Sequence, residues 1–518
     1  MIRHLFLLIL LVVTGVRAES QVFSDPAPPL MQELADITPP EARVQEGLKF
    51  SGAPKPLATS AVTHEWRNFL GPSHNAVSNE TPLLKRFGKS GPAVVWEVTR
   101  GQGYASPAVV GQRVLLFHRM GDEEVIECLH AETGRRFWKY AYGTAYEDRY
   151  GFSGGPRAQP VSDGEYVYTF GAEGKLHCLK LTTGQVVWKR DILREFKLEQ
   201  NFFGVGTTPL IEGDLLIVNV GAEGGPCVAA FDRRSGKMVW GAGSEWGQSY
   251  ASPVPADVFG RRRVFVFAGG ESQPSTGGLL CLDPATGKVD FSFSWRAKRR
   301  ESVNASSPLV IGRQVYLSEC YGPGGVLLDL LPDGSYRKVW SNQTLRTHFM
   351  TAIHKDGYLY GIDGHGPGNA PLVCIELKTG QEMWRIEPEW EEVDRSGDTA
   401  RKYRLSPGLA SLLLVDGRGL MLSEYGHLVW LDLNPKEYRE LDRVRLFAAG
   451  ETWAMPALSR GLLYVCQNNR DDDGTPPRLI CYDLRAVPSI EPNSTTKQMQ
   501  RKIGTSSASV PVPTGPLR

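Results

Sequence analysis

The stretch from Cys178 to Trp188, C-L-K-L-T-T-G-Q-V-V-W, decides the fold of this chain. A short apolar strand runs into a Thr-Gly turn, and a Trp follows the Gly four residues later. The same pattern recurs at Cys128 to Trp138, Ala230 to Trp240 and Cys374 to Trp384, and Cys281 to Phe291 repeats it with Phe in place of Trp. Such copies indicate a repeat protein, in which neighbouring units bury each other's apolar faces.

Eight repeats are predicted, because eight segments with Pro or a substitute for it stand before an apolar strand. Their openings lie roughly 43 to 60 residues apart, which is the range of four-stranded propeller blades. Alternating and β-branched residues after each opening favour strands over helices. The openings begin at Tyr104, Arg157, Gly206, Tyr250, Ala305, His348, Gly408 and Trp453.

The two ends of the repeat region complement each other. The eighth repeat stops after Cys481 to Arg485 without a final strand, and Val94 to Val98 forms a strand that no repeat contains. Donating this strand to the last blade would close the ring and protect edges that could otherwise pair with other chains. The sequence therefore predicts an all-β fold: a single eight-bladed β-propeller with four-stranded antiparallel blades, closed by an N-terminal strand.

The N-terminus predicts export. Arg3 and His4 precede an apolar run, Leu5 to Val13, and Val16-Arg17-Ala18 places small residues where a signal peptidase cuts. That run is too short to span a bilayer, and no Cys follows it as a lipid-anchor site. We therefore expect a periplasmic or secreted protein, cut after Ala18, with no membrane span and no lipid anchor.

Composition divides the chain into four segments. Of its 518 residues, 41% are hydrophobic and 22% charged, which suits a large folded protein. Pro-, Ala- and Glu-rich sequence before the repeats indicates a flexible linker, with one helical turn near Met31 to Ala35, and Pro-, Ser- and Thr-rich sequence after them indicates a disordered tail. The predicted segments are a signal peptide over 1–18, the linker over 19–62, the propeller over 63–486 and the tail over 487–518.

Charge and cysteine usage exclude some functions. The formal net charge of +1 gives no overall attraction to nucleic acid or anionic membranes, and the basic run Arg296 to Arg300 is expected to be a solvated loop. Most cysteines occupy one repeat position in different blades, so they should be buried and unpaired. Cys466 and Cys481, on adjacent strands of the last repeat, could meet, and the sequence leaves their pairing open.

The repeated Trp is predicted to be structural. A broad aromatic ring at one fixed place in each blade can pack against the next blade, and the Thr-Gly turn supplies a residue free to adopt positive φ. This role is assigned to Trp96, Trp138, Trp188, Trp240 and Trp384.

The repeat resembles that of the quinoprotein dehydrogenases, the PQQ-like eight-bladed β-propellers. The family contains periplasmic dehydrogenases that hold pyrroloquinoline quinone (PQQ) and calcium. It also contains scaffolds, such as the propeller lipoprotein of the outer-membrane β-barrel assembly machinery. The resemblance covers roughly Trp66 to Arg485 and rests on Thr133-Gly134…Trp138, Thr183-Gly184…Trp188, Ser235-Gly236…Trp240, Thr286-Gly287 and Thr379-Gly380…Trp384.

This resemblance implies one of two functions, and the residues favour the scaffold. Many alcohol-oxidising relatives have a vicinal Cys pair over the quinone, and no two cysteines are adjacent here. Those enzymes hold calcium with Glu, Asn and Asp, with a further Asp as base. No stretch matches these motifs, although Glu245, Asn304 and Glu301 have suitable atoms near blade openings. We expect no catalytic residue, metal or cofactor, with a PQQ- and calcium-dependent oxidoreductase of alcohols or sugars as the alternative.

A binding site is predicted at one mouth of the central channel, where the loops entering the innermost strands meet. The five large side chains at this place, Tyr104, Arg157, Tyr250, His348 and Trp453, alternate imperfectly with Gly and Ala, which suggests a shaped cavity. The same residues could instead plug the channel. The expected partner is a protein, peptide or glycan, and nucleic acid is not expected.

The chemistry of these side chains and the order of the blades around the ring predict how the site is arranged. Arg157 carries a planar fork suited to carboxylate or phosphate, and Trp453 and Tyr104 carry flat faces that can stack on a sugar or quinone. These three side chains should converge on one side of the mouth, with His348 and Tyr250 nearer the other. If the loops carry little blade packing, Arg157→Ala and Trp453→Ala should weaken binding several-fold and leave melting nearly unchanged.

Overall fold

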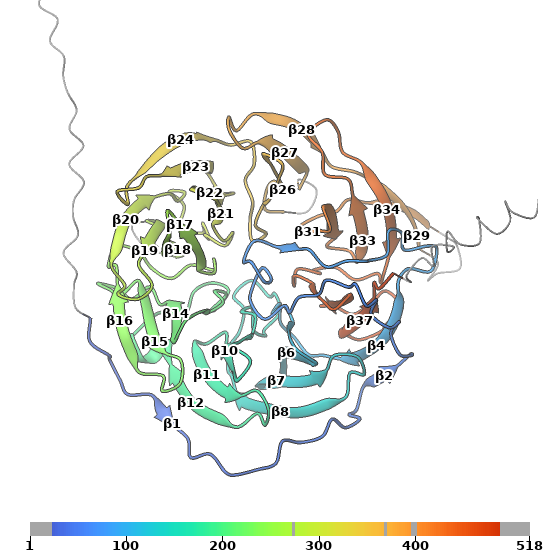
Figure 1. Ribbon diagram of the computed structural model, residues 1–518, viewed down its shortest axis with the longest axis horizontal. Helices are drawn as coiled ribbons and strands as arrows, with labels where there is room; N and C mark the ends of the chain where they lie inside the picture. The colour runs from blue at the N-terminus through green and yellow to red at the C-terminus, as the bar shows by residue number, and fades with distance from the viewer. Residues whose placement is uncertain (1–22, 272–274, 367–369, 395–400, 487–518) are drawn as a thin grey trace, which may run out of the picture.

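The computed structural model describes residues 23–271, 275–366, 370–394 and 401–486, so the predicted signal peptide and the predicted tail lie outside the described residues. Viewed down its short axis, the molecule is a ring of sheets around a central axis (Figure 1). Eight sheets are each built on four antiparallel strands running from the axis outward. The predicted all-β, eight-bladed propeller is therefore confirmed.

The blades follow one another in chain order, each with its strands in sequence from the axis outward. Blades 1 to 4 consist of β5 (Ala108–Val110), β6 (Arg113–Met120), β7 (Glu123–His130) and β8 (Arg136–Gly143); β9 (Val161–Ser162), β10 (Tyr166–Phe170), β11 (Lys175–Lys180) and β12 (Val186–Asp191); β13 (Leu210–Glu212), β14 (Leu215–Asn219), β15 (Val228–Asp232) and β16 (Met238–Ala242); and β17 (Val254–Val258), β18 (Arg261–Ala268), β19 (Gly278–Leu282) and β20 (Val289–Ser294).

Blades 5 to 8 repeat this order, except that the outer strand of blade 8 comes from the N-terminal side. They consist of β21 (Leu309–Ile311), β22 (Gln314–Glu319), β23 (Gly324–Leu330) and β24 (Tyr336–Asn342); β25 (Ile353–Lys355), β26 (Tyr358–Ile362), β27 (Leu372–Glu376) and β28 (Glu382–Ile386); β31 (Ser411–Val415), β32 (Arg418–Leu422), β33 (His427–Leu431) and β34 (Glu440–Arg445); and β35 (Ala457–Ser459), β36 (Leu462–Gln467), β37 (Arg478–Asp483) and β4 (Ala93–Thr99). Elements outside the blades are β1 (Leu30–Met31), β2 (Leu48–Phe50), β3 (Val77–Ser78), the hairpin β29 (Trp390–Asp394) and β30 (Arg401–Leu405), and the short helix α1 (Ile192–Glu195).

The ring closes through β4. This strand pairs antiparallel with β37, so that Trp96 lies opposite Cys481 and Val98 lies opposite Leu479. The predicted closure by Val94 to Val98 is therefore confirmed. Backbone groups on β37 that would otherwise form an open edge are hydrogen-bonded within the blade.

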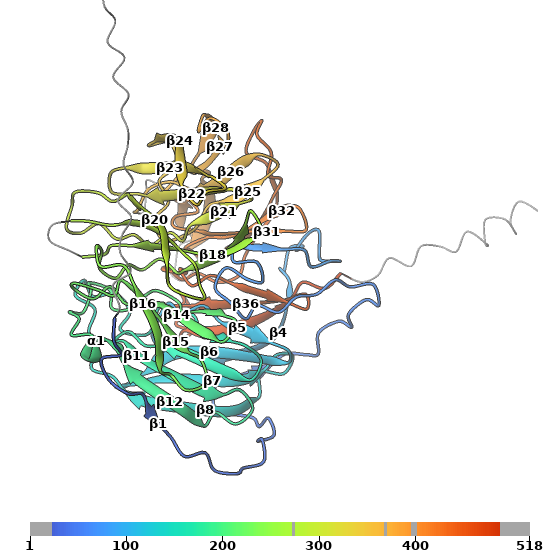
Figure 2. The same cartoon turned by 60° about the vertical axis from the view of Figure 1, so that its left-hand side comes forward.

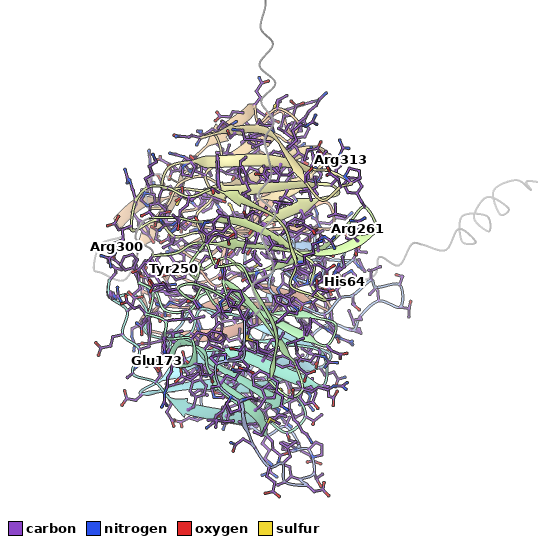
Figure 3. The ribbon with its side chains drawn as sticks, turned by 90° about the vertical axis from the view of Figure 1, so that its left-hand side faces the viewer. His64, Glu173, Tyr250, Arg261, Arg300 and Arg313 are labelled. Atoms are coloured by element: carbon purple, nitrogen blue, oxygen red, sulfur yellow. The ribbon has the colours of Figure 1, made fainter. Side chains whose placement is uncertain are left out.

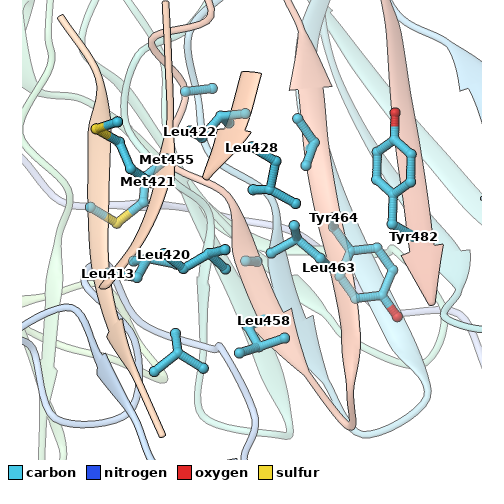
Figure 4. Close-up of a cluster of buried hydrophobic side chains, with 14 of the residues drawn as sticks. Leu413, Leu420, Met421, Leu422, Leu428, Met455, Leu458, Leu463, Tyr464 and Tyr482 are labelled. Atoms are coloured by element: carbon cyan, nitrogen blue, oxygen red, sulfur yellow. The ribbon is translucent and has the colours of Figure 1, made fainter. Parts of the chain in front are cut away.

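Apolar side chains fill the spaces between blades. Figure 4 shows one such cluster, in which Leu413 and Leu420 of blade 7 lie beside Leu458 and Leu463 of blade 8. All four are buried. A sheet covered on both faces can bury nearly every residue of its inner strands, and burying each Leu stabilises the fold by about 1.5–3 kcal/mol.

A Trp of the outer strand links most blades to the next. Its indole N–H donates to a backbone carbonyl of the following blade, and in five of the six cases its ring lies against that blade's turn glycine. A Cβ added at Gly184, which has φ +75°, would lie 2.6 Å from the Trp138 ring. Gly is thus required both for the turn and for the close approach. The six donations are Trp96 to Ala131 (2.8 Å), Trp138 to Leu181 (2.8 Å), Trp188 to Arg233 (3.0 Å), Trp240 to Pro284 (3.0 Å), Trp340 to Leu377 (2.8 Å) and Trp384 to Asn434 (2.9 Å).

The described part of the predicted linker, 23–62, lies against the ring. It passes outside β12, β8 and β4 (Figure 1, Figure 2), where β1 pairs with β12 and β2 pairs with β4. The expected helical turn near Met31 to Ala35 is wrong, because Leu30–Met31 form β1. The unpaired outer edge of a blade offers hydrogen-bond partners that favour an extended chain there.

The next segment enters the central channel. Trp66 is fully buried, and its backbone forms an antiparallel β-bridge with Val109 of the innermost strand β5. Strand β3 pairs in parallel with the innermost strand β31. The segment thus joins blades 1 and 7 from inside the ring.

Two further observations concern disulfide bonds and membrane-spanning helices. All eight cysteines are buried and free, so Cys466 and Cys481 do not form a disulfide. In the described ranges, no helix is long and apolar enough to cross a bilayer.

Candidate functional site

The loops that enter the innermost strands gather at one end of the channel. Figure 3 shows Tyr250, Glu173 and Arg300 toward this end and His64 and Arg261 toward the other. Loops at the first end connect the outer strand of each blade to the inner strand of the next. This end is the mouth predicted from the repeat openings.

Trp453 occupies the centre of the mouth. Its ring centroid lies 5.2 Å from that of Tyr104, 5.6 Å from that of Phe152 and 5.8 Å from that of Phe349. These three rings come from the loops that enter blades 1, 2 and 6. Because blades 2 and 6 face each other across an eight-bladed ring, a side chain that contacts both loops lies over the axis.

Further rings continue this contact network on both sides of Trp453. Phe152 contacts Phe203 (6.0 Å), which contacts Tyr250 (5.7 Å), while Phe349 contacts His348 (5.1 Å). We call the whole set the aromatic mouth: Tyr104, Phe152, Phe203, Tyr250, His348, Phe349 and Trp453. Phe152 is 38% exposed, and neighbouring Tyr150 is 54% exposed, so the network reaches the surface.

The structure brings Tyr104 together with both Trp453 and Arg157. The Arg157 guanidinium lies 5.7 Å from the Tyr104 ring centroid. The Tyr104 hydroxyl donates to Glu451 at 2.5 Å, and burial, followed by this carboxylate, raises the pKa of Tyr104. Tyr104 therefore stays protonated and keeps donating.

Arg157 has no free fork to offer a ligand. One terminal nitrogen donates to Asp148 at 2.6 Å and the other donates to the Gly155 carbonyl. The Asp148 side chain is 1% exposed and also accepts the backbone N–H groups of Tyr150 (2.9 Å) and Phe152 (3.2 Å). The Arg157–Asp148 pair therefore shapes the loop that presents the two exposed rings.

His348 and Tyr250 lie in separate branches of the network. The Tyr250 hydroxyl accepts the Phe203 N–H at 3.0 Å. The His348 ring shares a 3.1 Å hydrogen bond with the Tyr321 hydroxyl. Burial, and then repulsion from His365, lowers the pKa of His348 to about 3. Both side chains thus hold loops in place from within the mouth.

We expect His348 to make stability depend on pH. A pKa of about 3 in the folded chain, below the ordinary value of 6.5, means that protons bind the unfolded chain more readily. Its contribution is fully present above pH 6.5 and is lost as the pH falls toward 3. Urea unfolding at pH 7, 5 and 4 should show a flatter dependence for His348→Phe than for the unmodified protein. Equal slopes would contradict this.

The side chains considered for calcium do not gather. Glu245 and Glu301 are exposed, whereas Asn304 is buried and donates to the Ala268 carbonyl at 2.8 Å. Within the residues that the structure describes, no three His, Cys, Asp or Glu side chains form a group that could hold a metal ion. The residues present at these blade openings therefore do not fit a calcium–quinone donor set.

Several residues of the aromatic mouth do not stand at the start of a repeat opening, the position from which the site was predicted. Phe152, Phe203 and Phe349 come from different places in loops of unequal length, and Asp148 stands nine residues before its partner Arg157. The clearest local signal is the glycine-rich stretch from Gly151 to Gly155, in which Phe152 is the one large side chain.

Comparison with known proteins agrees with the repeat pattern. The family model described as outer membrane protein assembly factor BamB matches residues 121–386. No curated protein sequence matches the chain.

Solved structures similar to this chain include two dehydrogenases and BamB. A quinohemoprotein alcohol dehydrogenase from Comamonas testosteroni is 14% identical, with a TM-score of 0.58 over 82% of this chain and 81% of its own. A europium-containing methanol dehydrogenase is 12% identical, with a TM-score of 0.58 over 81% and 98%. BamB from Moraxella catarrhalis is 15% identical, with a TM-score of 0.49 over 76% and 98%. These identities show the fold alone. Because the family model spans about half of the chain, this protein belongs to the PQQ-like propeller family of the outer membrane protein assembly factor BamB.

Proposed function

We propose that this protein is a non-catalytic binding scaffold of the cell envelope and that its aromatic mouth holds a protein, peptide or glycan partner. The observation that carries the proposal is the contact network of rings over the axis, which reaches the surface at Phe152 and Tyr150. Rings held on blade loops offer large contact area at little conformational cost, and such rings dominate binding energy at interfaces.

The loop that carries these rings is built to keep them in place. Asp148 and Arg157 fix its backbone, and Trp453 supports the Phe152 ring from the axis. The exposed edge also has polar groups, including Arg149, whose guanidinium nitrogen lies 3.6 Å from a carboxylate oxygen of Glu271. Flat apolar faces beside polar groups suit a sugar ring or an aromatic peptide side chain.

The alternative is a PQQ-dependent oxidoreductase acting on an alcohol or sugar, which the fold of the solved dehydrogenases suggests. The two functions separate in one experiment. The purified protein is mixed with PQQ and calcium, bound-quinone absorbance is recorded, and alcohols and aldoses are screened with an artificial electron acceptor. If the protein is a scaffold, it should turn over none of these substrates. Turnover of any of them would mean that the protein is an oxidoreductase.

We expect Phe152→Ala to weaken partner binding. Removing an exposed ring at the centre of an interface costs about 2 kcal/mol, which corresponds to roughly thirtyfold in affinity. Glycan and peptide arrays should identify a ligand, and titration should then compare this variant with the unmodified protein. Val239→Ala is the matched control, because Val239 is also exposed but lies on β16, outside the mouth. Equal weakening by both variants would place the site elsewhere.

A further inference from the structure

The segment that passes outside the ring leaves a row of apolar side chains uncovered. Residues 23–50, which we call the strap, cover the outer edges of blades 2, 1 and 8 in that order (Figure 1, Figure 2). Strands β1 and β2 are each the outermost strand of their sheet, so the far side of the strap faces solvent. Apolar side chains gathered on one surface are typical of interaction sites. Five are exposed here: Leu30 (60%), Met31 (54%), Ile37 (46%), Val44 (69%) and Phe50 (54%).

The strap is anchored to the ring by buried polar groups. The Arg190 side chain is fully buried, and its guanidinium donates to both carboxylate oxygens of Asp25, at 2.5 and 3.2 Å. Gln45 is also buried. Its amide donates to the Gly134 carbonyl at 2.8 Å, and its side-chain oxygen accepts the Arg136 N–H at 3.0 Å. These anchors fix which side of the strap faces solvent, so the exposed apolar row needs a partner from outside the strap.

Exposed carboxylates accompany the apolar row. Within the described ranges, four acidic side chains of the strap are exposed and form no ion pair: Glu33, Asp36, Glu41 and Glu46. The basic side chains in this stretch are Arg43 and Lys49, and Lys49 already pairs with Glu97 at 3.0 Å. The surface therefore favours a partner that is both apolar and positively charged, and it disfavours an anionic membrane.

Residues 487–518 have this chemistry, and they begin beside the strap. They contain four basic residues and one acidic residue, and apolar side chains such as Met499 and Ile503 stand among the basic ones. The Arg485 guanidinium donates to the Lys55 carbonyl at 2.6 Å, and the Lys55 N–H donates to Asp483 at 2.9 Å. The end of the described chain is thus held next to the residues that follow the strap.

The spacing of the charges matches from this common point. Glu46 to Glu33 stand 9 to 22 residues before Lys55, and Lys497 to Lys502 stand 12 to 17 residues after Arg485. An extended chain covers about 3.3 Å per residue, so residues 487–518 running antiparallel to the strap would bring the basic residues to its acidic part.

We propose that residues 487–518 dock on the solvent-facing side of the strap. Lys497, Arg501 and Lys502 bind the four carboxylates, and the apolar side chains between them cover the exposed row. The occupant is this chain itself, because a segment tethered beside its site has a high effective concentration there and outcompetes a free partner of equal chemistry. The proposal does not depend on the function of the aromatic mouth.

Carbodiimide coupling of the full mature protein tests this docking, because it joins a lysine amine to a carboxylate where the two are in contact. We expect Lys497 and Lys502 to be linked to the carboxylates of the strap at low salt, and the links to be lost in about 1 M NaCl. Glu382 is the matched control, since it is exposed on the outer strand β28 of blade 6, which the strap does not cover. In a mixture of nitrogen-15-labelled and unlabelled protein, each link should join residues of one isotope.

Neutralising the strap should release the docked segment. In the combined variant Glu33→Gln, Asp36→Asn, Glu41→Gln and Glu46→Gln, trypsin should cut after Arg501 at least roughly tenfold faster than in the unmodified protein, because the undocked fraction rises. The matched control combines Asp122→Asn and Glu123→Gln, two exposed acidic residues between β6 and β7. It should be cut at the rate of the unmodified protein.

Three results would overturn the proposal. The first is that links from Lys497 and Lys502 to the strap are absent, or no more frequent than links to Glu382. The second is links between labelled and unlabelled copies, which would make a second copy the occupant. The third is unchanged cleavage after Arg501 in the combined variant, with the melting temperature showing that this variant is folded.

Discussion

A chain that begins at Gly101 should lose cooperative unfolding and aggregate. This deletion removes β4, so β37 loses its partner and the last blade presents an open, apolar edge. It also removes Trp96, a fully buried side chain whose loss alone costs about 3–5 kcal/mol. Because ordinary domains are stable by only about 5–15 kcal/mol, the ring should not remain closed.

A second chain, beginning at Ser51, tests whether the loss of β1 and β2 alone explains this result. It lacks β1 and β2, which add strands to the outside of the ring, but keeps β4 and the segment in the channel. We expect it to unfold cooperatively at a lower temperature than the full mature protein. Calorimetry and light scattering compare the three proteins. If the chain beginning at Gly101 melts like the mature protein, β4 is not the closing strand.

Arg157→Ala should destabilise the protein substantially. The variant leaves the Asp148 carboxylate, 1% exposed, without its cation, and breaking a buried ion pair in this way costs about 3–5 kcal/mol. This reverses the expectation drawn from the sequence, in which Arg157 could be removed at little cost to melting. Hydrogen bonds from Tyr146, Tyr150 and Phe152 to Asp148 reduce the loss without cancelling the charge.

Double variants show whether the pair itself is responsible. Adding Asp148→Asn to Arg157→Ala should recover part of the lost free energy of unfolding, because the uncompensated charge is gone. Arg439→Ala is the matched control: its partner Asp432 is 39% exposed, and such a pair contributes about 0–1 kcal/mol. Urea unfolding measures all four proteins. Unchanged stability in Arg157→Ala would mean that Asp148 is held by the loop backbone alone.

The blades could be predicted from the sequence because their determinants are local and repeated. A strand, a Thr-Gly turn and a Trp within eleven residues define both the hairpin and the contact to the next blade, as Trp138 and Gly184 show. Closure could be predicted as well, since Val94 to Val98 and Cys481 to Arg485 are the two parts of one incomplete repeat. Because this local pattern repeats along the chain, it specifies the whole ring of blades.

The candidate site could be predicted only at the repeated position. Tyr104 and Trp453 stand there, and the structure places their rings 5.2 Å apart. Phe349 directly follows the repeated position at His348, whereas Phe152 reaches the same place from within a loop, five residues before Arg157, so no repeat spacing relates it to Trp453. Their meeting depends on the ring bringing opposite blades together over one axis.

The sequence by itself determined the strands, the turns, the blade order and the closing strand, because neighbouring residues and neighbouring repeats specify them. The tertiary structure alone decided which loop side chains meet over the axis, that Asp148 engages Arg157, and that the segment 23–62 lies along the blade edges. It also decided that Phe87 stacks on Trp430 of blade 7 while the Leu84 backbone N–H donates to the Leu484 carbonyl of blade 8. These contacts join residues far apart in the chain, and their partners are fixed only when the ring closes.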